Sequence, residues 1–130
     1  AIVEYRRDQE IRTTGQLQNI VSEVYRKRRV NSKLNPATKT FQAIRIYVNQ
    51  ELANIKNVLP MAIRLLVHGG RCLVISFHSL EDRLVKQSFL EAQNQGIVTM
   101  IHKKPIVAEF IEQRNNYASR SAKLRGVEKI

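Results

Sequence analysis

The sequence predicts an α/β fold, because an apolar strand runs directly into an amphipathic helix and further helical segments precede it. The strand is the segment 71–76, in which residues 72–75 are all apolar. The helix that follows carries Leu80, Leu84 and Phe89 at helical spacing. Open α/β sheets bind ligands beyond the carboxyl ends of their strands. We therefore expect a functional site at the junction between this strand and this helix.

Three helical segments are expected before the strand. The first begins at Ile2, and Thr13 is placed to cap the second, whose apolar residues recur at helical spacing. A third, longer helix is expected over residues 38–68, with a kink or a new start at Pro60, because proline cannot complete the helical hydrogen-bond pattern. Residues 69–70, both glycine, are expected to end that helix with a left-handed cap.

The segment after the junction offers little further sheet. Its helix is expected to end near Gln93, and residues 97–102 and 117–127 are candidate strands. These strands are too few for a complete doubly wound domain, and no glycine-rich phosphate loop follows a first strand. We therefore expect the 130 residues to form one domain at most, or the second part of a larger one.

The composition also indicates a cellular setting. No apolar run approaches the roughly 20 residues that cross a bilayer, and no signal peptide opens the chain. Cys72 is the single cysteine, which suits a reducing compartment. A cytoplasmic protein is therefore expected.

The chain is strongly basic, with 22 Lys and Arg against 11 Asp and Glu and a formal net charge of +11. Such a charge indicates a polyanionic partner. With four Tyr, four Phe and no Trp, contact with a nucleic-acid backbone is expected ahead of an extended row of stacked bases. A membrane surface ranks second, and a merely solvated loop is an equally open interpretation of the first of two basic clusters. The clusters are Arg26, Lys27, Arg28, Arg29 and Lys33, in an expected loop, and Arg120, Lys123, Arg125 and Lys129 near the end.

Four motifs, in order along the chain, carry a specific resemblance. They are NPATKTFQAIRI at 35–46, GGRCLVISFHSLEDRLVK at 69–86, KKPI at 103–106 and RSAKLR at 120–125. Over essentially all of its length, the chain resembles the C-terminal part of the bacterial small-subunit (16S) ribosomal RNA cytosine-N4 methyltransferase family. It departs from the family pattern at Asn35, where the family has histidine, and at Tyr117, where the family has proline.

The resemblance implies a Rossmann-like methyltransferase with a helical insert. Residues 1–45 would be the end of the insert with its basic loop, and residues 46–130 the C-terminal part of the Rossmann-like domain. The segment 71–76 would be the fifth strand of the sheet, and the closing segments would supply antiparallel sixth and seventh strands. The family's motifs for S-adenosyl-L-methionine would lie upstream of residue 1, so that no cofactor-binding residue is expected in this chain.

The implied activity is methylation of the N4 amine of a cytidine in small-subunit ribosomal RNA. The implied partner is ribosomal RNA or the small ribosomal subunit, with no membrane partner. A non-catalytic, basic RNA-binding module derived from the family is the open alternative. A homodimer is a further possibility, because a strand that lacks its neighbour leaves an edge that pairs with other chains.

The candidate catalytic residue is His78, which follows the strand end and suits proton transfer near neutral pH. Phe77 suits stacking on an extruded base, and a position in the core is an equally open interpretation. The full set of candidate RNA-binding residues is Phe77, Ser79, Arg83, Lys86, Arg45, Arg26, Lys27, Arg28, Arg29, Arg120, Lys123 and Arg125.

Two polar residues of the junction are also expected to have structural roles. Ser79 is the expected N-cap of the helix. Asp82 is expected to stabilise the first helical turn and to pair with Arg83 or Lys86. No metal site is expected, because the other two histidines lack companions at metal-ligand spacing.

Overall fold

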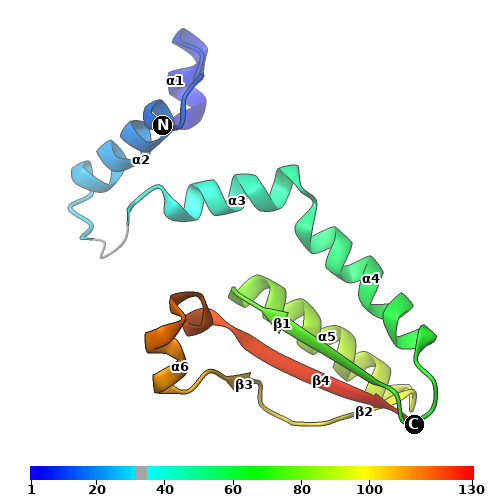
Figure 1. Cartoon of the computed structure of the whole chain (residues 1–130). Coiled ribbons are helices and arrows are strands. Elements are labelled where there is room, and N and C mark those ends of the chain that lie inside the picture. The colour runs from blue at the N-terminus through cyan, green and yellow to red at the C-terminus, as the bar shows by residue number, and fades with distance from the viewer. Residues whose placement is uncertain (32–34) are drawn as a thin grey trace. The chain divides into compact units, whose positions relative to one another are not determined.

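The computed structural model describes residues 1–31 and 35–130, which form two compact units, Ala1–Asn49 and Gln50–Ile130. Lys33, a member of the first basic cluster, lies outside the described residues. Each unit is described by itself, with the element labels of Figure 1. The assignment of residues 1–45 to a helical insert and of residues 46–130 to a methyltransferase domain stays a prediction.

The first unit consists of α1 (Ile2–Asp8), α2 (Thr14–Lys27) and α3 (Thr38–Val48). Thr13 caps α2, as predicted: its hydroxyl accepts a hydrogen bond from the Gln16 N–H, and the Gln16 side chain accepts one from the Thr13 N–H. Leu17 and Val21 of α2 pack with the fully buried Ala37 in a small core. α2 extends to Lys27, so the first basic cluster begins inside the helix and not in the expected loop.

The expected long helix is two helices. α3 ends at Val48, and α4 (Glu51–Leu65) begins after Gln50, whose φ of 52° is left-handed and ends the helical path. α4 continues through Pro60, so the new start expected there is wrong, while the kink stays a prediction. Pro60 and Lys56, whose carbonyl loses its helical donor, are both exposed residues, so the missing hydrogen bond lies on the exposed side of the helix.

The two glycines also act differently from the prediction. α4 ends at Leu65, four residues before Gly69. Gly69 has a φ of 74° and lies in a turn in which the Gly70 N–H donates to the Val67 carbonyl. The left-handed residue therefore turns the chain into the strand and does not cap the helix.

The second unit contains a four-stranded sheet of β1 (Arg71–Ser76), β2 (Val98–Met100), β3 (Ile106–Val107) and β4 (Lys123–Lys129). β4 lies between β1 and β2 and also pairs with β3, and each of these pairings is antiparallel (Figure 1). Consequently β1, β2 and β3 run in the same direction, and β4 runs against all of them. The predicted strand at 71–76 is confirmed, whereas the expectation of two strands antiparallel to it is wrong for 97–102.

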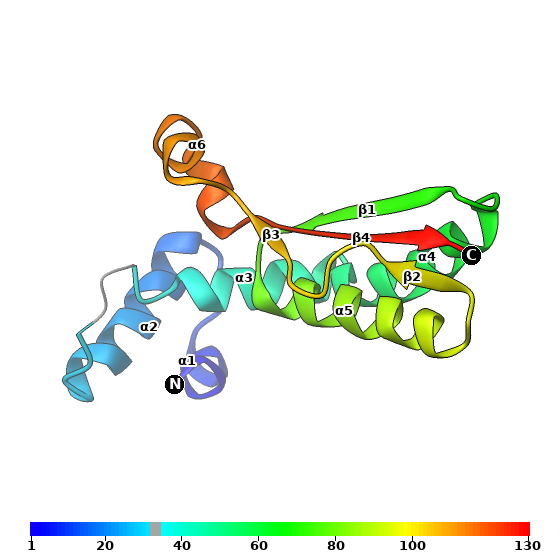
Figure 2. The same cartoon turned by 90° about the horizontal axis from the view of Figure 1, so that it is seen from below.

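Helices cover one face of this sheet (Figure 2). α5 (Ser79–Asn94) contacts β1, β2 and β4 and packs against α4. The core between these layers contains Val85 and Phe89 of α5, Val98 of β2, Val127 of β4, and Leu59 and Ile63 of α4. The candidate strand at 117–127 is only half strand, because α6 (Phe110–Asn115) and the 3-10 helix η1 (Tyr117–Ser121) precede β4.

The other face of the sheet is apolar and exposed. Leu73 and Ile75 of β1 are 60% and 57% exposed. The side chains of Leu73 and Ile101 pack over Gly126 of β4. A Cβ at this position would lie 2.6 Å from Leu73 Cδ2 and 2.9 Å from Ile101 Cδ1. Among the described residues, β1 pairs only with β4, so that its second edge has no strand beside it. Such a face and edge are typical of a sheet that continues into further polypeptide.

Within the residues that the structure describes, none of the helices has the length and apolar character needed to cross a membrane.

Candidate functional site

The junction between β1 and α5 is closed by His78. This residue is the N-cap of α5, with extended backbone, and its Nδ1 accepts a hydrogen bond from the Glu81 N–H at 3.3 Å. The predicted N-cap, Ser79, is instead the first helical residue and is exposed. The cap is therefore one residue earlier than predicted, and an imidazole takes the place of the expected hydroxyl.

The Glu81 carboxylate completes this network from the third position of the helix. Its Oε2 accepts hydrogen bonds from the Phe77 N–H at 2.9 Å and from the His78 N–H at 3.2 Å. The side chain is 20% exposed, and its negative charge lies at the helix N-terminus, where the macrodipole favours it. Glu81 thus holds the two residues that link the strand to the helix in one conformation.

The hydrogen bonds of His78 determine what its ring can do. Because Nδ1 accepts a hydrogen bond, the neutral ring carries its proton on Nε2. Nε2 is buried, 3.3 Å from Glu81 Oε1, and has no hydrogen-bond partner within the described part of the chain. The lone pair that would accept a substrate proton is therefore already used, and this geometry favours a positioning role over the predicted proton transfer.

Glu51 of α4 lies close to this pair. One ligand atom each from Glu51, His78 and Glu81 lie within 4.8 Å of one another. Sequence reasoning missed this group, because Glu51 is far from the others along the chain. A metal ion bound through Nε2 would need the proton on Nδ1, where it would face the Glu81 N–H, and Glu81 Oε2 already accepts two N–H groups. His78 and Glu81 therefore form a capping network better suited to orienting the junction than to holding a cation.

Phe77 is the residue that this network presents. Its backbone N–H is fixed by Glu81, while its side chain is 52% exposed. Of the two interpretations of Phe77, the exposed ring at the carboxyl end of β1 argues against a position in the core. An exposed aromatic ring on a fixed backbone suits stacking with a nucleobase.

Asp82 is a structural residue, as predicted, but its partners differ from the predicted ones. Its carboxylate pairs with Arg125 at 2.7 Å and with Lys123 at 3.3 Å, both on β4, instead of Arg83 or Lys86. The Asp82 and Arg125 side chains are only 12% and 10% exposed. Hydrogen bonds from Arg125 lower the pKa of Asp82. Burial raises this pKa and so partly opposes them, while a hydrogen bond from Lys123 lowers it further.

This ion pair changes the interpretation of two candidate RNA-binding residues. The guanidinium of Arg125 is turned inward and joins β4 to α5, which argues against contact with RNA. Lys123 pairs with Asp82, but its side chain is 39% exposed and also reaches solvent. Arg83 and Lys86, by contrast, are exposed on α5.

The remaining candidates lie on two other parts of the molecule. Arg26, Lys27, Arg28 and Arg29 are exposed around the end of α2, where Glu23 lies within 3.7 Å of Arg26 and 3.4 Å of Lys27. Arg45 is exposed on α3 of the same first unit. Arg120 belongs to η1 of the second unit and lies over the ring of Tyr117.

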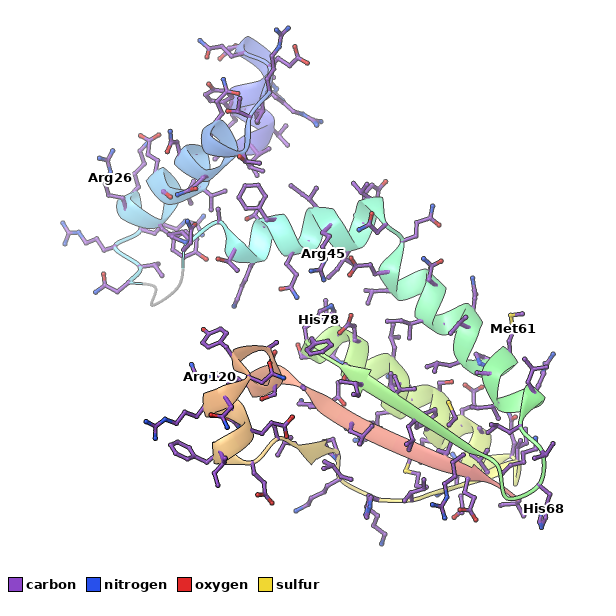
Figure 3. The ribbon with its side chains drawn as sticks, in the orientation of Figure 1. Arg26, Arg45, Met61, His68, His78 and Arg120 are labelled. Carbon is purple, nitrogen blue, oxygen red and sulfur yellow. The ribbon has the colours of Figure 1, made fainter. Side chains whose placement is uncertain are left out.

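The strand pairing brings η1 to the same end of the sheet as the junction. Ser76, the last residue of β1, pairs with Lys123, the first residue of β4, and η1 ends only two residues before Lys123. Figure 3 shows Arg120 and His78 at this end of the sheet. The exposed ring of Phe77 and the Tyr117–Arg120 pair thus occur where the carboxyl end of β1 meets the start of β4.

A model of the MraW methylase family matches residues 1–130. The chain therefore belongs to the MraW methylase family. It is 51% identical over 130 residues to a ribosomal RNA small subunit methyltransferase H of Borreliella burgdorferi and 48% identical to the protein of that name from Borrelia hermsii. In both comparisons the whole chain is covered, and it spans 43% of the relative's length.

Proposed function

We propose that the protein carrying this chain is an S-adenosyl-L-methionine-dependent methyltransferase that acts on the N4 amine of a cytidine in small-subunit ribosomal RNA. The observation that carries this proposal is the exposed, backbone-fixed Phe77 at the carboxyl end of β1, in a chain that belongs to a methylase family. The name shared by the relatives supports the RNA substrate. Such a substrate would be met in the cytoplasm.

We also propose that this chain is the C-terminal part of that protein. The chain spans 43% of its relatives' length and its sheet has an unpaired edge at β1, which supports a place in a larger protein. The final strand, β4, runs against its neighbours, which supports a place at the end of the sheet. The remaining polypeptide would pair with β1 and cover Leu73 and Ile75. If the chain is produced without that polypeptide, the same edge is the surface through which a homodimer would form.

The described residues do not fit the cofactor. A nucleotide-like cofactor in this class of fold is held by a glycine-rich turn that leaves a helix N-terminus open. At the junction of β1 and α5, His78 and the Glu81 carboxylate already occupy the helix N-terminus, and residues 108–109, which join β3 to α6, include no glycine. We propose that the cofactor motifs lie in the upstream part of the protein.

The chemistry asks mainly for positioning from this chain. The lone pair of the cytosine amine is delocalised into the ring, so orienting the nitrogen toward the methyl donor is the principal task. The base has to leave its stack to be reached, which requires a surface that receives it. Phe77 supplies such a surface, and the network of His78 and Glu81 keeps that surface in place.

This proposal is tested by incubating the full-length protein with small ribosomal subunits and S-adenosyl-L-methionine and digesting the RNA to nucleosides. We expect N4-methylcytidine by mass spectrometry, and we expect calorimetry to show no saturable cofactor binding by the 130-residue chain alone. RNA binding without any methylated nucleoside would instead support the non-catalytic RNA-binding module. Micromolar cofactor binding by the chain alone would contradict the upstream position of the cofactor motifs.

A further inference from the structure

Tyr117 and Arg120 form an exposed stacked pair on the second unit. The Tyr117 side chain is 72% exposed, and the Arg120 guanidinium carbon lies 4.4 Å from the centre of its ring. At this distance the cation is attracted by the π-face of the ring. The contact also fixes the planar guanidinium, which would otherwise move freely in solvent.

The short helix that carries this pair is held by local hydrogen bonds and by the burial of Ser119. Ser119, which lies between the two residues, is 5% exposed, and its hydroxyl donates to the Asn116 carbonyl at 2.8 Å. The Ala122 N–H donates to the Ser119 carbonyl at 3.1 Å, immediately before β4 begins. With Ser119 held inward, Tyr117 and Arg120 project as a surface on a fixed base.

This surface lies at the same end of the sheet as Phe77. η1 leads into Lys123, which pairs with Ser76 at the end of β1, and Phe77 follows Ser76 directly. Figure 3 shows Arg120 and His78 at this end. Aromatic and guanidinium planes are the groups on which unpaired bases stack, because every base offers a π-face to them.

We propose that Tyr117 and Arg120 form a stacking site for one base of unpaired RNA, beside the site at the end of β1. The identity of the RNA rests on the proposed function, but the chemistry of the site does not. The formal net charge of +11 favours an anionic strand, and Arg120 adds attraction for its phosphates to the stacking surface. When a target base is extruded, each neighbouring base loses a stacking partner. Such a neighbouring base is the ligand that Tyr117 and Arg120 fit.

The test uses the full-length protein and two RNA probes, an unpaired oligonucleotide and the duplex of the same sequence. Tyr117→Ala is expected to weaken binding of the unpaired probe by about 5- to 150-fold, while Tyr117→Phe, which keeps the ring, binds it as the wild type does. Binding of the duplex, whose bases are already stacked, is expected to stay unchanged in both variants. Tyr47→Ala is the matched control, because Tyr47 is also a highly exposed tyrosine, at 84%, but lies on α3 of the first unit.

Three results would overturn the inference. The first is that Tyr117→Ala binds the unpaired probe as the wild type does. The second is that Tyr47→Ala loses as much affinity for this probe as Tyr117→Ala. The third is a lower melting temperature of Tyr117→Ala, which would show that the full-length protein covers this ring. Methylation by the wild-type protein is measured separately. If the wild type forms no methylcytidine while Tyr117→Ala selectively loses the unpaired probe, the proposed function is wrong and the stacking site stands. If the wild type methylates and Tyr117→Ala binds normally, only the stacking site is wrong.

Discussion

Replacing Asp82 with alanine is expected to lower the free energy of unfolding by about 3 to 5 kcal/mol. The substitution removes the partner of Arg125, whose side chain is 10% exposed, and leaves a buried positive charge between β4 and α5. Urea denaturation of the full-length protein at neutral pH measures the loss. Glu128→Ala is the matched control: it breaks the Arg71–Glu128 pair, which joins β1 and β4 at the same 2.7 Å distance but is 65% and 35% exposed. Its expected loss is below about 1 kcal/mol.

The stabilising contribution of Asp82 also depends on pH. Its pKa is lower in the folded protein than in the unfolded chain, where it is about 3.9. The contribution is therefore complete above that unfolded pKa and is lost as the pH falls through the folded pKa. The difference in stability between the wild type and Asp82→Asn is expected to shrink below about pH 4. A difference that stays constant from pH 7 into the acid range would contradict an ion pair at this position.

Neutralising Arg26, Lys27, Arg28 and Arg29 with glutamine is expected to reduce the slope of log affinity for RNA against log salt concentration by about 3 to 4. All four residues are exposed around the end of α2, and each phosphate contact releases close to one counterion. Glutamine is a good helix former, so α2 is retained. Affinity for unrelated RNA sequences is expected to fall equally, because phosphate contacts carry no sequence information.

The control for this prediction is the double variant in which Lys56 and Arg64, both exposed on α4, become glutamine. Its salt slope is expected to equal that of the wild type. A slope unchanged in the four-residue variant would show that the first basic cluster is a solvated surface. A fall of similar size per charge in both variants would show that the effect follows net charge and not a defined contact surface.

The strand and the helix at the centre of the site were predictable, because both carry strong local periodicity. The cap between them was harder to assign, because two capping patterns lie one residue apart: His78 with Glu81, and Ser79 with Asp82. The structure uses the first, since Asp82 is turned inward to Arg125, 43 residues along the chain. The cap is thus one residue earlier than the local pattern predicted, and the tertiary ion pair of Asp82 favours this position.

Other features lacked any local signal. The break between α3 and α4 occurs at Gln50, without a glycine or proline, while Pro60 continues a helix whose exposed surface tolerates the missing hydrogen bond. Arg125 resembles an exposed strand residue in the sequence, but its register with Val74 places it on the helix-covered face of β4. The stacking of Arg120 on Tyr117 depends on a 3-10 helix in a segment whose pattern indicated a strand.

The central claim is that the RNA base to be methylated is received at the carboxyl end of β1, on Phe77. The most direct test is the single-turnover rate of methylation by full-length Phe77→Ala on saturating small ribosomal subunits. Because the Phe77 ring is 52% exposed, its removal should leave the fold intact, and Leu90→Ala serves as the control at a residue that is 42% exposed near the other end of α5. We expect Phe77→Ala to be slower by about 10- to 100-fold, with Leu90→Ala at the wild-type rate. A wild-type rate in Phe77→Ala would contradict the placement of the active site at this end of the strand.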